Sequence, residues 1–238
     1  MNKVIIIGAS AGIGRELALL YAANNWMVGI TGRRKELLQS LQQDFPENIM
    51  TECFDVTGDD NIESIRNLTQ QLGGLDLLIY NSGYGEPSEI TDWEIDKNTI
   101  LTNVTGFTEI VNFTFNYFVV EGKGHIAATS SLASIRGNSF APAYSASKAY
   151  MSNYMEGLYI KAAKLKLPIC LTDIQPGFVK TKMAKGNGQF WVAPVDKAAH
   201  QIYAGIKNKK RRIYITKRWW LIAKLLYCLP IALYKKIG

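Results

Sequence analysis

Three side chains that can act together in proton transfer lie close in the sequence: Ser131, Tyr144 and Lys148. Tyr144 and Lys148 are four positions apart, so on a helix they would lie on one face, one turn apart. A phenol titrates near pH ~10, and an opposite charge within about 4–6 Å lowers that pKa by roughly one to three units. The lysine is therefore expected to make the phenol a proton donor and acceptor near neutral pH, beside the Ser131 hydroxyl.

A glycine-rich turn at the start of the chain adds a second signal, because a Tyr-x-x-x-Lys pair alone is often just an exposed pair on a helix. Residues 3–7 form an aliphatic run typical of a strand covered on both faces, and helical spacing resumes at residue 15. Glycines between a strand and a helix let the backbone approach a pyrophosphate, which the free N–H groups of the helix then face. An ordinary tight turn is the alternative. The predicted cofactor-binding residues of this turn are Gly8, Ser10, Gly12, Ile13 and Gly14.

Together these motifs resemble the short-chain dehydrogenase/reductase family, from about residue 3 to about residue 216. The resemblance implies an α/β fold: a doubly wound, parallel, seven-stranded Rossmann sheet with helices on both faces, as one domain over residues 1–216. It implies an NAD(P)-dependent oxidoreductase that interconverts a carbonyl and a secondary alcohol. It assigns the catalytic roles to Ser131, Tyr144, Lys148 and Asn103, the last of which serves the proton relay. It also implies cofactor contacts from Asp55, Val56, Asn81, Gly83, Tyr144, Lys148, Pro176, Gly177, Val179 and Thr181.

The chain departs from the family pattern at three places. Ile7 stands where a threonine is common, and Tyr80 and Ser82 replace residues of the usual Asn-Asn-Ala-Gly. Asn103 lies inside an expected helix over residues 91–118. Asparagine is a poor helix former, so either it has a function or it is an exposed polar residue.

The residues after the second expected strand indicate which cofactor is used. Residues 27–31 end in Thr31, where NAD-preferring sites usually place a carboxylate for the ribose 2′-hydroxyl. Arg33 and Arg34 follow, and arginine binds a 2′-phosphate through forked, charge-assisted hydrogen bonds. We therefore predict NADP(H) rather than NAD(H), with a solvated charge run as the alternative.

Charge and cysteine content exclude several classes of protein. All 20 acidic residues lie at or before Asp196, whereas residues 207–238 hold ten Lys or Arg; the first 206 residues therefore carry a net charge of −3. This distribution disfavours general nucleic-acid binding. The three cysteines are far apart and odd in number, which argues against a disulfide scaffold and favours a reducing, cytoplasmic compartment. The two histidines are isolated, and no metal site is predicted.

Residues 217–238 form a basic, apolar C-terminal tail beyond the family core. Its apolar run is shorter than the roughly 20 residues that a spanning helix needs, and it contains Lys224 and Pro230. We expect the tail to lie on an anionic membrane surface, making the protein peripherally membrane-associated. The alternative is a helix packed on the domain or on a second subunit.

The sequence thus predicts an NADP(H)-dependent oxidoreductase, with a short substrate lid over residues 182–193. The apolar lid and tail favour a lipophilic ketone, and the family analogy implies a homodimer or homotetramer. The rival interpretation is a non-catalytic, nucleotide-binding membrane adaptor that retains the fold. The sequence leaves the substrate, the physiological direction and the subunit number open.

Overall fold

Short runs of branched aliphatic residues form the strands of the protein. The computed structural model describes residues 1–181 and 189–236, and these contain a parallel sheet of seven strands. The strands are β1 (Lys3–Ile7), β2 (Met27–Gly32), β3 (Ile49–Cys53), β4 (Leu77–Tyr80), β5 (Gly124–Thr129), β6 (Ile169–Pro176) and β7 (Arg212–Ile215). Their order in the sheet is β3-β2-β1-β4-β5-β6-β7, with every neighbouring pair parallel. The predicted doubly wound sheet is confirmed.

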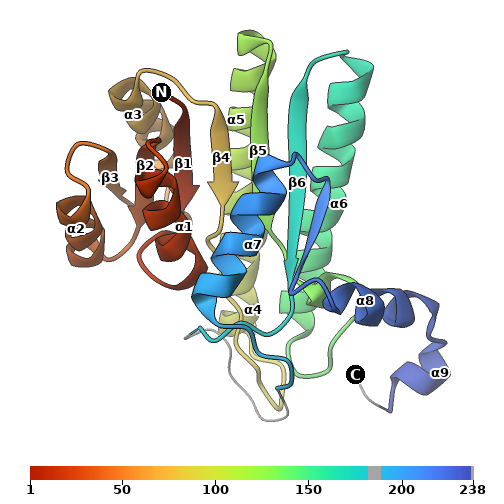
Figure 1. Cartoon of the computed structure of the whole chain (residues 1–238). Helices are drawn as coiled ribbons and strands as arrows, with labels where there is room; N and C mark the ends of the chain where they lie inside the picture. Colours follow the sequence, from red (N-terminus) through yellow and green to blue (C-terminus); the bar gives the residue numbers. More distant parts are fainter. Residues whose placement is uncertain (182–188, 237–238) are drawn as a thin grey trace.

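Helices connect the strands and cover both faces of the sheet (Figure 1). One face carries α1 (Gly12–Ala23), α2 (Lys35–Asp44) and α7 (Val195–Lys207). The other carries α3 (Asn61–Leu72), α5 (Phe107–Glu121) and α6 (Pro142–Lys164). Along β1, Val4 and Ile6 belong to the first core and Ile5 and Ile7 to the second, as expected for a strand buried on both faces.

The helix expected over residues 91–118 is interrupted by a π-helical turn. It consists of α4 (Trp93–Ile100), the π segment η1 (Leu101–Gly106) and α5 in direct succession. Asp92 caps the start of α4 by accepting a hydrogen bond from the Glu94 N–H at 2.9 Å. Asn103 lies within η1, and π turns inside helices are frequent at functional sites.

The C-terminal tail forms two short helices, α8 (Trp219–Cys228) and α9 (Ile231–Tyr234), at the lower right of Figure 1. Trp219 and Ala223 are buried in a small apolar cluster with Leu132. Arg136 donates hydrogen bonds to the carbonyls of Leu226 and Leu229, at 3.3 and 2.8 Å. The inner face of α8 therefore packs on the domain, as the alternative to membrane binding predicts, whereas most of its other apolar side chains are exposed.

None of the helices that the structure describes is long and apolar enough to cross a membrane. The strands of Figure 1 all point toward the same edge, where α4, α8 and the loops after β4, β5 and β6 lie. In open α/β sheets, ligands bind at this carboxyl edge. The predicted site residues are therefore expected there.

Candidate active site

The long helix α6 positions Tyr144 and Lys148. It begins at Pro142, whose fixed backbone angle suits the first position of a helix. Lys148 is buried, and its Nζ donates to the Thr129 carbonyl at 3.0 Å and to Met151 Sδ at 3.4 Å. The same Nζ lies 5.7 Å from the centre of the Tyr144 ring. The predicted spacing thus brings the two side chains together over the end of β5.

The pKa shifts of this pair differ from the sequence-based expectation. Burial raises the pKa of the Tyr144 phenol above its ordinary value, and a hydrogen bond with Ser131 lowers it only in part. Burial also lowers the pKa of Lys148 to about 8, although the charge of Asp173 opposes that shift. The expected depression of the tyrosine pKa by the lysine is therefore wrong for this structure, because a buried phenol resists ionisation and Lys148 is not among the causes of its shift. The arrangement keeps Tyr144 protonated, as a proton donor must be.

Ser131 and Tyr144 are joined by that hydrogen bond, which places the serine hydroxyl beside the phenol. Ser131 follows β5 and begins the 3₁₀ turn η2 (Leu132–Ser134), where its Oγ also accepts from the Ala133 N–H at 3.1 Å. Two hydroxyl groups from different elements thus lie within hydrogen-bonding reach of each other. A carbonyl oxygen bound beside them can receive hydrogen bonds from both.

Asn103 is fully buried and holds the loop that follows β4. Its side chain accepts from the Tyr84 N–H at 2.9 Å and donates to the Tyr84 carbonyl at 2.7 Å. It also donates to Ser147 Oγ on α6 at 2.9 Å. Tyr80 supports the same turn, because its hydroxyl donates to the Thr102 carbonyl at 2.8 Å. Asn103 is therefore no exposed polar residue, and this family departure at Tyr80 has a structural reason.

The glycine turn has the close contacts that a phosphate cradle requires. A Cβ on Gly14 would lie 2.2 Å from the Gly8 carbonyl oxygen and 2.8 Å from Asn81 Nδ2. Gly8 has φ +83°, and a Cβ there would lie 2.8 Å from the Ser82 backbone. Asn81, which follows β4, connects the ends of β1 and β5. It donates to the Gly8 carbonyl at 3.1 Å and accepts from the Thr129 hydroxyl at 3.1 Å. Ser10 and Ile13 lie in the same turn and are largely buried, while Gly12 packs near Thr181.

The two arginines after β2 contact different parts of the predicted cofactor site. Arg34 donates to Ser10 Oγ at 2.7 Å, and Arg33 lies 3.4 Å from the Asp55 carboxylate. Burial raises the pKa of Asp55, but hydrogen bonds from Thr57 and the Arg33 charge outweigh burial and hold the pKa below its usual value. Arg34 therefore adjoins the turn that would face a pyrophosphate, and Arg33 adjoins Asp55 after β3. This donor set fits a dinucleotide with an additional phosphate.

The remaining predicted cofactor residues lie along the same edge. Val56 follows β3, Gly83 follows β4 and adjoins Lys148 Nζ, and Pro176 ends β6. Val179 forms a bridge with Ala193. Of the expected lid, residues 182–188 lie outside the described residues, while Phe190 and Trp191 are described. The fold thus brings the predicted cofactor residues and the predicted catalytic residues to one edge of the sheet.

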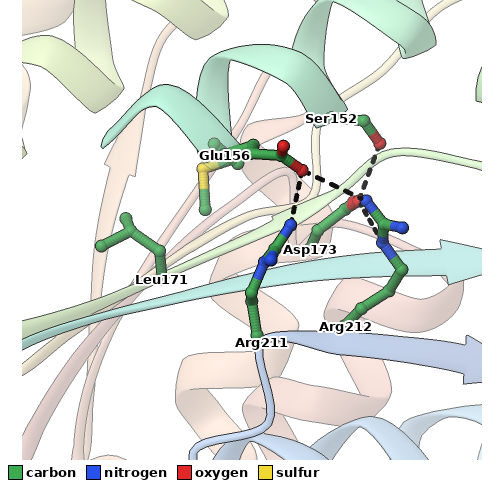
Figure 2. A pocket seen from close by; sticks show the side chains of 7 residues that line it. Ser152, Glu156, Leu171, Asp173, Arg211 and Arg212 are labelled. Atoms are coloured by element: carbon green, nitrogen blue, oxygen red, sulfur yellow. Dashed lines mark hydrogen bonds and ion pairs between the residues drawn. The ribbon is translucent and has the colours of Figure 1, made fainter. Parts of the chain in front are cut away.

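Two features of the site were not predicted from the sequence. The first is an aromatic cluster in which Trp219 of the tail lies 5.0–5.7 Å, centre to centre, from the rings of Phe178, Phe190 and Trp191. Its indole lies so close to Gly177 that a Cβ there would come within 2.2 Å. The second is a buried polar network around Asp173 (Figure 2). The only signal for the latter was one acidic residue inside an otherwise uncharged strand.

Comparisons with known proteins show the family and the fold of this chain. The sequence model of the family described as short chain dehydrogenase matches residues 2–190. An uncharacterized oxidoreductase of Myxococcus xanthus is 37% identical over 192 residues, which cover 78% of this chain and 75% of that protein. An uncharacterized oxidoreductase of Mycobacterium tuberculosis is 27% identical over 100% of this chain and 97% of its own length. The solved structure of a short-chain dehydrogenase from Sphingobium yanoikuyae in complex with NADPH matches with a TM-score of 0.82 at 19% identity, over 98% of each chain.

The fold and the matched residues define a Rossmann-type oxidoreductase. The chain belongs to the short-chain dehydrogenase family.

Proposed function

We propose that the protein reduces a carbonyl group, or oxidises the matching alcohol, with Tyr144 as the acid–base group. The hydrogen bond between Ser131 and Tyr144 carries this proposal, because it brings two hydroxyl groups within reach of one carbonyl oxygen. When bound, a reduced nicotinamide supplies the hydride. In the direction of reduction, Ser131 polarises the carbonyl oxygen, and Tyr144 donates a proton to it. Lys148 holds positive charge beside the phenol as it gives up that proton.

Asn103 keeps this arrangement in place. Because it binds both the N–H and the C=O of Tyr84, it fixes the loop that lies over Lys148. In the relay that the family resemblance implies, Asn103 and Lys148 return a proton to Tyr144 after each turnover. The rival role, a non-catalytic nucleotide-binding membrane adaptor, has no use for a buried tyrosine held by a serine.

NADP(H) is the proposed cofactor. Arg34 adjoins the glycine turn and Arg33 adjoins Asp55, where the adenosine half of a dinucleotide would lie. β2 ends at Gly32 without a carboxylate that could favour a free 2′-hydroxyl. The NADPH found in the structure from Sphingobium yanoikuyae supports this choice. NAD(H) is expected to be the poorer cofactor.

The proposed substrate is a lipophilic ketone. The loops after β4, β5 and β6 frame the site and leave large apolar side chains exposed. Exposed side chains of this kind close together mark apolar ligand sites. The exposed residues are Ile90 and Trp93 after β4, Phe140 after β5, and Phe190, Trp191 and Val192 after β6.

The decisive experiment is Tyr144→Phe, assayed by NADPH consumption with a panel of long-chain and cyclic ketones. General acid catalysis is typically worth ~10²–10⁴-fold, so turnover should fall by about that factor while NADPH affinity stays within a few-fold. Tyr150→Phe is the matched control, because Tyr150 lies on the same helix but bonds Thr108 on the exposed side. A Tyr144→Phe protein that keeps more than about a tenth of the rate contradicts the assignment. A wild-type protein that binds NADPH but reduces no ketone favours the adaptor.

The outer face of the tail is proposed to lie on an anionic membrane surface. Five cationic residues flank its exposed apolar side chains: Lys217, Arg218, Lys224, Lys235 and Lys236. Residues 207–238 contain no acidic residue. Symmetric self-association through this face would oppose cations to cations without a compensating carboxylate, whereas anionic lipid complements them. The exposed apolar residues are Trp220, Leu221, Leu225, Tyr227, Ile231 and Leu233.

Vesicle sedimentation tests this membrane proposal. The full chain should sediment with phosphatidylserine-containing vesicles at low salt, and less with pure phosphatidylcholine. Each cation near the surface contributes about 1 kcal/mol, which salt weakens, so binding should fall but not vanish at high salt. A Leu221→Ser/Leu225→Ser double variant should lose the part that salt does not remove, because it changes only exposed apolar side chains. Full retention of the protein in the supernatant at low salt contradicts the proposal.

A homodimer or homotetramer in the cytoplasm completes the proposal. Helices α5 and α6 expose Val120, Tyr150, Tyr159 and Ile160, which a second copy could cover. Light scattering coupled to size-exclusion chromatography gives the subunit number directly. A monomer at micromolar concentration contradicts this part alone.

A further inference from the structure

A buried carboxylate is hydrogen-bonded to sequence neighbours of the catalytic residues, and the proposed chemistry gives it no role. Asp173 is on β6, is 6% exposed, and points toward α6. Figure 2 shows it between Ser152 of α6 and Arg212 of β7. A charge this deeply buried is costly unless it is paired and hydrogen-bonded. Its partners therefore show what the charge can do.

Four groups satisfy the two oxygens of Asp173. Oδ1 accepts a hydrogen bond from Ser130 Oγ. Oδ2 accepts from Ser152 Oγ at 2.7 Å and from Gln175 Nε2 at 2.8 Å. The guanidinium of Arg212 lies 3.4 Å from the same oxygen. The carboxylate is thus held by three hydrogen bonds and one ion pair.

The partners of Asp173 adjoin the catalytic residues. Ser130 precedes Ser131, and Ser152 follows Lys148 by one turn of α6. Gln175 also donates to Ser134 Oγ, at 3.3 Å, in the 3₁₀ turn that Ser131 begins. Asp173 therefore joins the end of β5 to the middle of α6, and the distance between those two elements sets the distance from Ser131 to Tyr144 and Lys148.

The charge of Asp173 also acts on Lys148. Around the ammonium lie the Thr129 carbonyl of β5, Tyr144 and Met151 of α6, Gly83 of the β4 loop and Asn103 beyond it. All of these groups except Tyr144 are non-titrating. Burial lowers the pKa of Lys148 to about 8, and Asp173 is the charged group that raises it.

A second group of charges surrounds Asp173 on its outer side. Arg212 approaches it from β7 and also lies 3.9 Å from Glu156 of α6, which pairs with Arg211. Tyr214 of β7 and Tyr227 of α8 face the same guanidinium. Arg212 is partly exposed, so its positive charge offsets Asp173 only in part.

We propose that Asp173 is a positioning residue for the reductase chemistry: it sets the placement of Ser131 relative to Lys148 and holds a negative charge against the turn of α6 that follows the lysine. This inference rests on the proposed function. The positive charge of Arg212, on the outer side of Asp173, partly offsets the action of that carboxylate on Lys148. A purely structural carboxylate would stabilise the fold without acting on the ionisation of Lys148.

Two substitutions of opposite charge effect separate these roles. Asp173→Asn keeps the shape and removes the negative charge, so the pKa of Lys148 should fall further. Arg212→Gln removes the opposing positive charge, so that pKa should rise. At an effective dielectric near 20, a charge some ~10 Å away shifts a pKa by about one unit, and the more exposed arginine should shift it by about half as much. Glu121→Gln, which alters an exposed carboxylate at the end of α5 outside this network, is the matched control.

The first readout is kcat/KM for carbonyl reduction between pH 6 and pH 10. Reduction needs the protonated Tyr144–Lys148 pair, so the rate should fall as pH rises through the pKa of Lys148, about 8. The fall should move to lower pH in Asp173→Asn and to higher pH in Arg212→Gln. Loss of rate without a shift, or shifts in the same direction, overturns the proposal.

The second readout needs no catalysis. The folded pKa of Lys148 lies below its ordinary value of 10.5, so between about 8 and 10.5 the unfolded chain binds a proton that the folded chain has released. Stability should therefore rise with pH across that window, and Lys148→Met should remove the rise. Urea unfolding should place the lower edge of the window at lower pH in Asp173→Asn and at higher pH in Arg212→Gln. A wild-type protein without reductase activity overturns the proposed function, while unchanged windows overturn the role of Asp173.

Discussion

Adjacent tryptophans of the tail should respond to the same substitution in opposite ways. Trp219 is 2% exposed, whereas Trp220 is 48% exposed on the outer face of α8. We expect Trp219→Ala to destabilise the fold strongly and to leave membrane binding intact. Trp220→Ala should leave the stability of the fold nearly unchanged and weaken membrane binding. Each substitution serves as the control for the other, because both remove an indole from one short helix.

The magnitude follows from the contacts of Trp219. Removing a buried tryptophan costs about 3–5 kcal/mol, and its three aromatic partners place this one toward the upper end. Among the described residues its buried Nε1 has no hydrogen-bond partner, so removing that polar group recovers about 1–3 kcal/mol. The net loss should be about 3 kcal/mol, a large part of the roughly 5–15 kcal/mol that stabilises a typical domain. Trp220→Ala should cost less than about 1 kcal/mol.

Urea unfolding followed by far-ultraviolet circular dichroism measures these losses without relying on tryptophan fluorescence. Sedimentation with phosphatidylserine vesicles, at a temperature where both variants are folded, measures membrane binding. Equal stabilities of the two variants, or a Trp219→Ala loss below about 1 kcal/mol, would refute the packing argument. If Trp219 stabilises the domain in this way, truncation after Thr216 should also destabilise it. A tail that is independent of the domain over residues 1–216 would instead leave the stability unchanged.

Three further outcomes are expected. Arg33→Ala and Arg34→Ala should each lower kcat/KM for NADPH by about ten- to a hundred-fold, since each removes one charge-assisted contact. The kcat/KM for NADH should not change, and equal use of both cofactors by the wild type contradicts this prediction. Gly14→Ala should weaken NADPH binding at least tenfold in a fluorescence titration, because its Cβ would lie 2.2 Å from the Gly8 carbonyl, and unchanged affinity would show that the turn is not the cradle. Asn103→Ala should cost about 1–3 kcal/mol in urea unfolding as well as turnover, because it leaves both backbone groups of Tyr84 without their partner; a stable, active variant contradicts it.

Local patterns predicted most of the fold. The aliphatic run of β1, the glycine turn and the Tyr144–Lys148 spacing are each contained within a few residues, so periodicity and turn chemistry suffice to place them. The order of the strands then brings their carboxyl ends together. The catalytic roles themselves remain predictions.

Properties that depend on packing could not be predicted in this way. The Tyr144 pKa was expected to be low from its neighbour four positions away, but burial by the whole site decides its direction. The π turn around Asn103 accepts a hydrogen bond at its Thr102 carbonyl from Tyr80, more than twenty residues earlier. Nearly every residue of α8 is apolar, so its sequence could not indicate that Trp219 faces the domain and Trp220 faces outward.

The attachment of the tail to the loop after Ser131 has a consequence for how substrate arrives. Arg136 of that loop binds the last carbonyls of α8, and Tyr234 of α9 donates to the Gly137 carbonyl at 2.6 Å. The tail and the loops that frame the site thus lie at the same edge of the sheet (Figure 1). A protein docked on the membrane through the outer face of α8 would hold the entrance of its active site against the lipid. Its rate would then follow the mole fraction of substrate within the membrane, a two-dimensional concentration, rather than the amount dissolved in the surrounding water.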